Sequence, residues 1–552
     1  MSLLSVLAFS TITSLPVSQA RGGVPRVPVE TQPLYWDRLD ASGRLVGGRV
    51  DLPVPPRPSR ADRIPAGCTT LSTSPLLGTS ANRIDLVVVG DGYQAGELPG
   101  YASQVDGLAT YFFNKEPYQS YQSAFLIHRV DVVSVDSGID NDPTPGVMKD
   151  TAMDMGLACN GSWPCIDHAK AYMYAHNAPA VDLVLAIGNS SAVSGYGWFS
   201  GIAATAGTGT SHYELVQHEL GHSLGRLGDE YDYGDGATYT GPEVAPANVS
   251  IRTEPEMAAA GVKWFQWLGE NDPAFDGLVS SFEGAYTYQF GVRRPTANSL
   301  MRTFFRPFNS PSAENIVIRI YAFVDPIDDS SSTATPYDGT ETLYVTPLSR
   351  LGPPMAIQWY LDGAPIAGAT GPTLDLSTVS LPTCESTISV KVTDTTPMVR
   401  NEAAREAFMS ETRRFDVRPA FSNYCTGAPN SAGPGGALML NAGSSSVSAN
   451  DLVLAVDACP GQKPGLFAWG QGRVQVPLGN GFGCIGSSLK RFRMQRTDAF
   501  GYAEKLVDLN ALPGGDSVVP GDVRNVQFYY RDPVAGGSNF NLSDALSVRF
   551  CP

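Results

Sequence analysis

Between residues 81 and 187 the sequence alternates short apolar, β-branched runs with segments whose apolar residues have helical spacing. The first run, residues 84–89, is interrupted only by Asp85, which is typical of a strand buried on both faces. Because strands that alternate with helices form layered sheets, this segment predicts an α/β domain. The predicted elements are strands at 84–89, 125–135 and 181–187 and helices at 101–114 and 166–176.

Beyond residue 325 the helical periodicity nearly stops. The chain has 57 glycines and 42 prolines in 552 residues, and both residue types disfavour long helices. Residues 326–340 predict a linker, residues 341–420 a small Ig-like β-sandwich around Trp359, and residues 424–552 a second β-rich domain. The expected fold is therefore multidomain, with an α/β domain at 81–325 followed by two all-β, sandwich-type domains.

The N-terminus has the pattern of an exported protein. Residues 1–20 resemble a secretory signal peptide, with an apolar run followed by the small residues Ser18 and Ala20, and a buried strand is the alternative. We therefore expect a secreted, extracellular protein that a bacterium exports. Residues 21–80 predict an N-terminal arm, in which residues 34–40 have a hairpin-like pattern. Two roles stay open for this arm, a structural extension and an inhibitory pro-segment.

The eight cysteines are an even number, which predicts disulfide bonds in an exported chain. Reduced, buried thiols are the alternative. No pair has the C-x-x-C spacing of a zinc knuckle, so we do not expect zinc bound by cysteine. The predicted pairs are Cys159 with Cys165, which flank a short turn-rich loop, Cys459 with Cys484, and Cys425 with Cys551.

The charge balance excludes some partners. The formal net charge is −16, whereas binding to a phosphate backbone needs clustered Lys and Arg, so we expect no nucleic-acid partner. After the N-terminus the sequence has no apolar run of about 20 residues, so we expect no membrane span. The acidic charge does not favour a particular substrate.

The segment from 211 to 222 carries the clearest chemical signal. It contains the pattern H-E-x-x-H, with His218, Glu219 and His222. Ser211 and Glu214 have the spacing of a capping box, which predicts that a helix begins there. On a helix the two histidines share one face and can bind one Zn²⁺, with Glu219 as general base for a water molecule.

A catalytic zinc site takes a third protein ligand. If the helix continued, Asp229 would lie about 10 Å from His222 along the axis, too far to share an ion. Gly225 and Gly228 are predicted to break the helix and fold the carboxylate back. We therefore predict Asp229 as the third ligand and Glu230 as the alternative. The acids that follow are expected to be solvated, with a weak Ca²⁺ site as the alternative: Asp232 and Asp235.

The stretch HELGHSLGRLGDEY resembles the signature of the immunoglobulin A peptidase family of zinc metallopeptidases, a metzincin-like group. A third metzincin histidine would fall at Gly228, where this chain has no ligand. The resemblance implies a metzincin-like α/β domain over about 82–325. It also implies a methionine turn at Met301 as a floor beneath the zinc, with an ordinary core residue as the alternative. Residues 195–204 would be an edge strand that pairs with an extended substrate, with a plain turn-rich strand as the alternative. The later segments resemble Ig-like and β-rich modules of exported bacterial proteins.

These patterns together predict a secreted zinc-dependent endopeptidase that acts on protein or peptide substrates. His218, His222 and Asp229 would hold one zinc ion, and Glu219 would be the catalytic general base. Two alternatives stay open. One is a non-catalytic surface- or matrix-binding protein with a degenerate peptidase domain, and the other is a zinc amidase that acts on cell-wall peptide.

Overall fold

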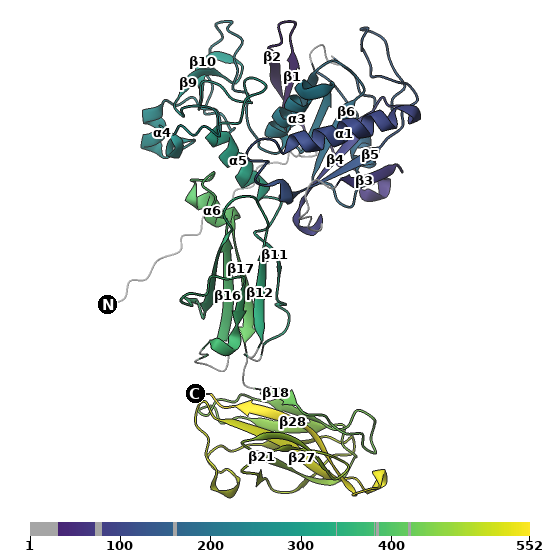
Figure 1. The fold of residues 1–552 in the computed structure, drawn as a ribbon, viewed down its shortest axis with the longest axis vertical. Coiled ribbons are helices and arrows are strands. Elements are labelled where there is room, and N and C mark those ends of the chain that lie inside the picture. Colours follow the sequence, from purple (N-terminus) through teal and green to yellow (C-terminus); the bar gives the residue numbers. More distant parts are fainter. Residues whose placement is uncertain are drawn as a thin grey trace, which may run out of the picture.

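The computed structural model of the chain describes residues 31–71, 80–157, 163–337, 339, 341–379, 381, 386–417 and 421–551. These residues form a multidomain, strand-rich molecule with few helices (Figure 1). The predicted signal peptide at 1–20 lies outside the described residues.

An eight-stranded mixed sheet forms the centre of the N-terminal part. Four adjacent strands of this sheet, β8, β6, β4 and β5, run parallel, as the alternating sequence pattern predicts. All residues of β4 are buried. The flanking strands run antiparallel to their neighbours. In order across the sheet, the strands are β2 (Leu45–Pro53), β1 (Thr31–Leu39), β7 (Ser194–Trp198), β8 (Ile202–Ala206), β6 (Leu183–Gly188), β4 (Ile84–Asp91), β5 (Phe125–Asp131) and β3 (Gly67–Leu71).

Helices cover both faces of this sheet. Helices α1 (Leu98–Phe112) and α3 (Gly209–Ser223) lie on one face (Figure 1), and α2 (His168–Ala175) packs on the other. The side chains of successive residues of β4 point to the two faces in turn, as in any strand. Leu86 packs in the cluster of α1 and α3, and Val87 packs in that of α2. The strands and helices predicted between 81 and 187 are confirmed, with shifted ends.

The segment expected as an N-terminal arm at 21–80 contributes strands to both edges of the sheet. Strand β3 pairs with β5 at one edge, and the hairpin of β1 and β2 pairs with β7 at the other. The expectation that residues 195–204 form an edge strand is therefore wrong. Strand β7 lies between β8 and β1, and its outer backbone groups already bond to β1.

After α3 the chain forms a region of loops, two short helices and one hairpin beside the sheet (Figure 1). Helix α5 packs against the C-terminal end of α3, where the Asn315 side chain donates a hydrogen bond to the carbonyl of Gly225 at 2.5 Å. The elements of this region are α4 (Glu254–Ala260), β9 (Phe282–Ala285), β10 (Tyr288–Arg294) and α5 (Ser310–Ile320).

Residues 327–417, here called the middle β-unit, form two further sheets whose apolar side chains share one cluster with the helices of the first part. Residues 326–340, expected as a linker, contain strand β11, which pairs with β12. One sheet contains β11 (Ile327–Ser330), β12 (Thr342–Pro347) and β15 (Thr373–Asp375). The other contains β14 (Ala364–Pro365), β13 (Ala356–Leu361), β16 (Ser386–Thr393) and β17 (Ser410–Val417), and α6 (Glu402–Phe408) precedes β17.

Residues 421–551, the C-terminal β-unit, have their own apolar cluster around Trp469 and Phe528. The largest sheet contains β18 (Phe421–Tyr424), β28 (Phe540–Arg549), β27 (Val523–Arg531), β21 (Pro464–Gly470), β24 (Lys490–Arg491) and β25 (Gln495–Arg496). Beside it lie one sheet of β19 (Leu438–Ala442), β20 (Val453–Asp457) and β26 (Ala503–Leu506), and a hairpin of β22 (Arg473–Leu478) and β23 (Gly481–Ile485).

The disulfide bonds differ from two predicted pairs. Cys425 is bonded to Cys484, so the pairs Cys425–Cys551 and Cys459–Cys484 are both wrong. Cys459 is a buried free thiol, and burial raises the pKa of its side chain. Sequence spacing could not find this bond, because its cysteines lie at the end of β18 and in β23, which tertiary folding brings together. Cys165 is disulfide-bonded, and its predicted partner Cys159 lies outside the described residues.

Among the described residues, no helix has both the length and the apolar character that a membrane crossing requires.

Candidate metal centre

Helix α3 begins earlier than its sequence predicts. Its N-cap is Thr208 and its first residue is Gly209, so the capping box expected at Ser211 and Glu214 is wrong. Glu214 instead lies buried against α1, where its carboxylate accepts hydrogen bonds from the side chains of Tyr111 and Lys115. Tertiary partners therefore use the carboxylate that the local pattern assigned to the cap.

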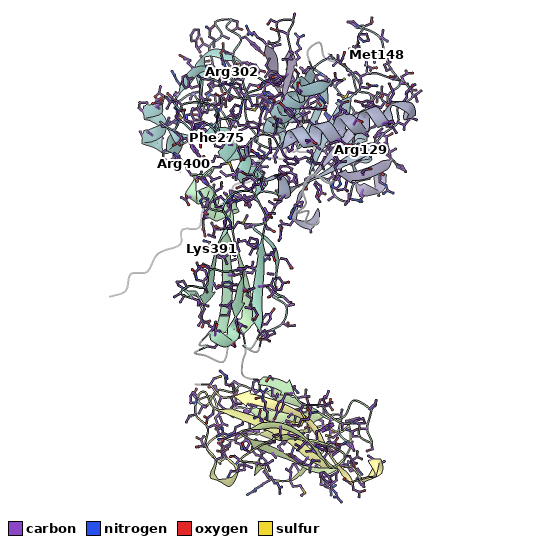
Figure 2. The ribbon with its side chains drawn as sticks, in the orientation of Figure 1. Arg129, Met148, Phe275, Arg302, Lys391 and Arg400 are labelled. Carbon is purple, nitrogen blue, oxygen red and sulfur yellow. A yellow bond between two sulfur atoms is a disulfide. The ribbon has the colours of Figure 1, made fainter. Side chains whose placement is uncertain are left out.

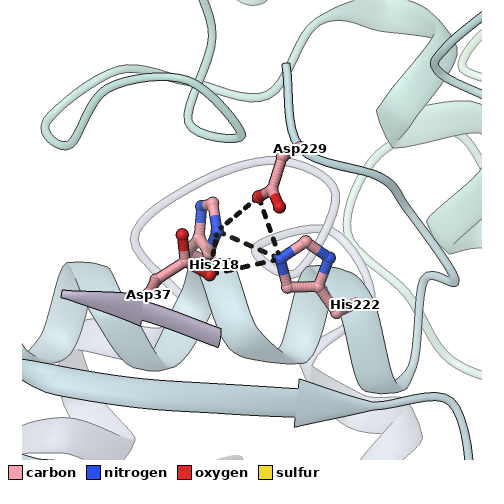
Figure 3. A group of neighbouring side chains, drawn as sticks. All are labelled: Asp37, His218, His222 and Asp229. Atoms are coloured by element: carbon pink, nitrogen blue, oxygen red, sulfur yellow. Dashed lines mark hydrogen bonds and ion pairs between the residues drawn. The ribbon is translucent and has the colours of Figure 1, made fainter. Parts of the chain in front are cut away.

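The two histidines of α3 point to one side of the helix, as their spacing predicts (Figure 3). The Nδ1 of His218 lies 3.1 Å from the carbonyl oxygen of Leu300, and the Nδ1 of His222 lies 2.8 Å from that of Leu227. Because a carbonyl only accepts, each Nδ1 carries the hydrogen of the neutral ring. Both Nε2 atoms, 3.1 Å apart, are then free to donate a lone pair to one cation.

The chain turns back after α3 and brings Asp229 to the histidines. The Oδ1 atom of Asp229 lies 3.3 Å from the Nε2 of His218 and 3.3 Å from that of His222. The left-handed residue of the turn is Arg226, with φ of 50°, and not a glycine as expected. Gly225 and Gly228 instead permit close packing, because a Cβ on Gly225 would lie 2.9 Å from Ile316 and one on Gly228 3.1 Å from Val249.

The alternative ligand, Glu230, points away from the histidines into a polar network. Its carboxylate accepts hydrogen bonds from Ser299 at 2.6 Å, from Asn248 at 2.8 Å and from Asn309 at 2.9 Å. Burial raises the pKa of Glu230, although these hydrogen bonds oppose the shift. The network holds the loop in place, because Asn248 also bonds both backbone groups of Gly228, next to Asp229.

A fourth group at this centre, Asp37 of β1, has no counterpart in the sequence prediction. Its Oδ2 lies 3.3 Å from the Nε2 of His218 and 3.7 Å from that of His222 (Figure 3). Its Oδ1 accepts a hydrogen bond from the hydroxyl of Tyr231 at 2.8 Å. Asp37, His218, His222 and Asp229 are all buried, and one potential ligand atom of each lies within 4.8 Å of the others.

Glu219 lies beside this group with both carboxylate oxygens buried and without a hydrogen-bond partner among the described residues. Burial raises its pKa well above the usual value, and the negative charge of Asp37 raises it further. The strand beside Glu219 has room for it only because Gly195 lacks a side chain. A Cβ on Gly195 would lie 3.0 Å from Oε1, and one on Gly197 would collide with the backbone of Glu219.

The arrangement fits a divalent cation. Three carboxylates converge in a buried space, and Asp37 Oδ2 and both oxygens of Asp229 have no hydrogen-bond partner among the described residues. Burying these carboxylates together destabilises the folded state unless a positive charge lies between them. Burial lowers the pKa of His218, but the charges of Asp37 and Asp229 outweigh it and raise that pKa well above the usual value. The field that favours a proton there also favours a metal ion.

Met301 lies under the helix between the two histidines. It is fully buried, and a Cβ on Gly221 would lie only 2.8 Å from its sulfur atom. Its backbone carbonyl accepts a hydrogen bond from the N–H of Glu230 at 2.8 Å, which ties this turn to the loop of Asp229. The alternative, an ordinary core residue beside Phe304 and Phe305, holds in part, because Met301 and Phe304 are buried in the same apolar cluster, whereas Phe305 is 59% exposed.

The other histidines and acids of the sequence analysis do not join the centre. Among the described residues, the only group of three or more side chains that could hold a metal is the one around His218. Asp232 pairs with Arg302 at 3.2 Å, and Asp235 is an exposed loop residue. Four histidines bind elsewhere: His128 contacts Asp85, His168 the hydroxyl of Tyr196, His176 the carbonyl of Pro58, and His212 the hydroxyl of Thr205.

Comparison with known families assigns the segment that carries this centre. Residues 75–276 match the model of a family described as IgA Peptidase M64. The match covers less than half of the chain and supports the IgA peptidase family for this segment. The predicted family is confirmed, and membership indicates a peptidase, a hydrolase that acts on protein. The matched segment contains His218, Glu219, His222 and Asp229, whereas Asp37 and Met301 lie outside it. No curated protein matches the chain in sequence.

Sequence reasoning missed Asp37 because nothing local marks it. It lies 181 positions before His218, in a strand whose pattern predicted only a hairpin. The only sequence feature that could have drawn attention to Asp37 was the hairpin-like pattern around it. A polar Asp between Trp36 and Arg38 in an otherwise amphipathic strand is ordinary on a solvent face and unusual on a buried one, and the sequence does not tell which face is buried.

Proposed function

We propose that the chain is a secreted, zinc-dependent endopeptidase with a metzincin-like catalytic domain. The observation that carries the proposal is the convergence of His218, His222 and Asp229 beside an unpartnered, buried Glu219 in a segment of the IgA peptidase family. Two imidazoles with a carboxylate are a ligand set that suits zinc. A bound Zn²⁺ would polarise the substrate carbonyl and acidify a water molecule.

The chain's own residues would supply binding, orientation and proton transfer. His218 and His222 are fixed by the carbonyls of Leu300 and Leu227, so their Nε2 atoms face the ion without rearrangement. Glu219 would accept a proton from the attacking water and later donate it to the leaving amine. Burial raises the pKa of Glu219, which favours the protonated form that donates to the leaving amine.

Three expectations belong to the same proposal. Export through the signal peptide at 1–20 is supported by the disulfide between Cys425 and Cys484, because such bonds persist in oxidising compartments. The β-units would hold the catalytic domain at a surface or on a substrate. The substrate class is protein, and immunoglobulin A is one member of the panel to test, since the family description names it.

The first prediction tests Glu219. The variant Glu219→Gln keeps the shape of the side chain but cannot accept a proton. We expect zinc content to stay at one ion per chain, and kcat/KM on casein to fall by about 10²–10⁴-fold. Zinc would be measured by mass spectrometry of the dialysed protein. Hydrolysis by the wild type should be lost on chelation and return with added zinc.

The control is Glu406→Gln, a substitution at an exposed glutamate that pairs with Lys391 in the middle β-unit. It should leave both zinc content and hydrolysis unchanged. Equal hydrolysis by Glu219→Gln and the wild type would overturn the mechanism. A panel of casein, immunoglobulin A and purified peptidoglycan separates an endopeptidase from a cell-wall amidase, since only the latter cleaves peptidoglycan.

A further inference from the structure

The strand β1 occupies the side of β7 that faces the metal centre. Strand β7 lies along helix α3, with Gly195 against Glu219 and Gly197 against the backbone of the same residue. The strand that pairs with the outer edge of β7 is therefore the one that passes over the metal centre. In this chain that strand is β1, which pairs antiparallel with β7 and places Asp37 opposite Gly195.

An extended peptide in place of β1 would reach the same atoms. Main-chain hydrogen bonds along a free strand edge are a general way to bind an extended peptide, and they are independent of its sequence. The residue opposite Gly195 would then lie against His218, His222 and Glu219, as Asp37 does now. Tyr35, two residues earlier on the same face, stacks on the ring of His222 with centroids 4.4 Å apart. Strand β1 and an extended substrate would exclude each other.

Asp37 also changes the number of protein ligands. His218, His222 and Asp229 make three, which is the number in zinc sites that keep a position open for water and substrate. Asp37 adds a fourth, which is the number in closed structural sites. Its Oδ2 has no hydrogen-bond partner among the described residues and points at the two Nε2 atoms. The present arrangement is therefore that of a closed site.

The hairpin forms one edge of the sheet, and its inner side chains Leu34, Tyr35 and Leu45 are buried against the rest of the domain. Among the described strands, β2 pairs only with β1, and it is exposed at alternate positions along its second half. The following segment, residues 54–66, is largely exposed and contains Arg57, Arg60 and Arg63. It crosses the molecule before β3 begins at the opposite edge of the sheet. Exposed segments of this kind are the preferred sites of proteolytic cleavage. The matched family segment begins at residue 75, after the hairpin.

We propose that the β1–β2 hairpin keeps the enzyme latent, with Asp37 as a removable fourth metal ligand and β1 in the place of the substrate strand. Cleavage in residues 54–66 by a protease that cuts after arginine would release the hairpin, open the fourth position and free the edge of β7. This inference rests on the proposed function, because it assigns the regulation of the same site.

The test uses the full chain with Co²⁺ bound, because the visible absorption of Co²⁺ reports both its coordination and the binding of acetohydroxamate. In Asp37→Asn the fourth ligand is weakened, while the amide oxygen can still accept the hydrogen bond of Tyr231. In the wild type, the state in which Asp37 has left the metal would be a minor conformation, and such conformations are typically about 0.1–10% populated. We therefore expect the apparent affinity for acetohydroxamate to rise by about ten- to a thousandfold, with a matching rise in casein hydrolysis.

Asp51→Asn is the matched control, since Asp51 lies on the same hairpin, is exposed and pairs with Arg49. It should bind acetohydroxamate as weakly as the wild type. Equal binding and hydrolysis by the wild type and Asp37→Asn would overturn the latency and leave the proposed function intact. A failure of all three proteins to bind Co²⁺ or zinc would overturn the metal site itself, and with it both proposals.

A second experiment keeps Asp37 and does not depend on the folding of a variant. Residues 59–62 are replaced by the recognition sequence of a site-specific protease, and the immobilised full chain is cut and washed. We expect the N-terminal fragment to leave and acetohydroxamate binding to rise as in Asp37→Asn. A fragment that stays bound after cleavage, or one that leaves without a rise in binding, would overturn the proposal.

Discussion

At the scale of single residues, the buried histidines differ in what faces their second nitrogen. Carboxylates face the Nε2 atoms of His218 and His222, and a cation is favoured there. His212 is equally buried, but its Nε2 faces the hydroxyl of Thr205 at 2.9 Å, and burial lowers its pKa to about 4. The same residue type on one helix is therefore a candidate metal ligand at one end and a neutral structural group at the other.

The lowered pKa of His212 predicts a pH dependence of stability. The unfolded state binds a proton below the ordinary value of 6.5, whereas the folded state resists it down to about 4. The free energy of unfolding should therefore fall as pH falls from 6.5 toward 4, by about 3 kcal/mol from this group. His212→Gln should remove that part of the slope, as measured by urea unfolding from pH 4 to 8. Above pH 6.5 the free energy of unfolding should depend on pH in the same way for the wild type and for His212→Gln. The same dependence below pH 6.5 would contradict the role of His212.

At the scale of elements, the loop after α3 decides whether a third ligand exists. The helix ends at Ser223, and the chain reverses within a few residues through Arg226 in the left-handed region. The N–H of Arg226 donates to the carbonyl of His222 at 2.9 Å, and that of Leu227 to Gly221 at 3.0 Å. This short closure returns Asp229 to the face that carries the two histidines.

The left-handed conformation of Arg226 predicts that glycine would suit this position better. For a residue with a Cβ, the left-handed conformation costs about 1–2 kcal/mol. Glycine avoids this cost, but its greater freedom in the unfolded chain offsets part of the gain. Arg226→Gly should therefore raise the free energy of unfolding by up to about 1 kcal/mol, with metal content unchanged. Arg226→Ala removes the same exposed side chain but keeps the Cβ, so it should give no gain. Equal stabilisation by both variants would assign the effect to charge instead of backbone strain.

At the scale of the whole molecule, the peptidase domain and the middle β-unit share a buried polar junction. The Oδ2 of Asp394 accepts hydrogen bonds from Tyr121 at 2.5 Å and Tyr321 at 2.7 Å, and its Oδ1 pairs with Arg350 at 2.9 Å. Arg400 lies at the same junction (Figure 2), with its guanidinium 4.1 Å from the ring centroid of Trp267. The two parts therefore depend on each other for burial and for charge balance.

This junction predicts that the middle β-unit stabilises the peptidase domain. Asp394→Ala leaves a buried arginine and two tyrosine hydroxyls without their partner, which should cost about 3–5 kcal/mol. Both parts should then unfold at a lower temperature, as followed by calorimetry and by loss of bound metal on heating. Asp416→Ala, an exposed acid in the same unit, should change neither. A lower transition for the middle β-unit alone would contradict the coupling.

The sequence alone determined what depends on neighbours in the chain. The periodicity between 81 and 187 predicted the central strands and helices, since the alternation of apolar side chains is set by the geometry of each element. The spacing of His218 and His222 placed both rings on one face for the same reason. The short return of the chain after α3 was also predictable from the need for a third ligand, although the residue that makes the turn was not.

Only the tertiary structure decided which distant segments meet. The partner of Cys425, the role of Glu214 and the coverage of β7 each depend on contacts between parts of the chain that no local pattern relates. Asp37 is the clearest case. Its register opposite Gly195 follows from the pairing of β1 with β7, and a shift of one residue would turn its carboxylate to the other face of the sheet. The sequence therefore supplied three of the four groups at the metal centre, and strand pairing supplied the one that closes it.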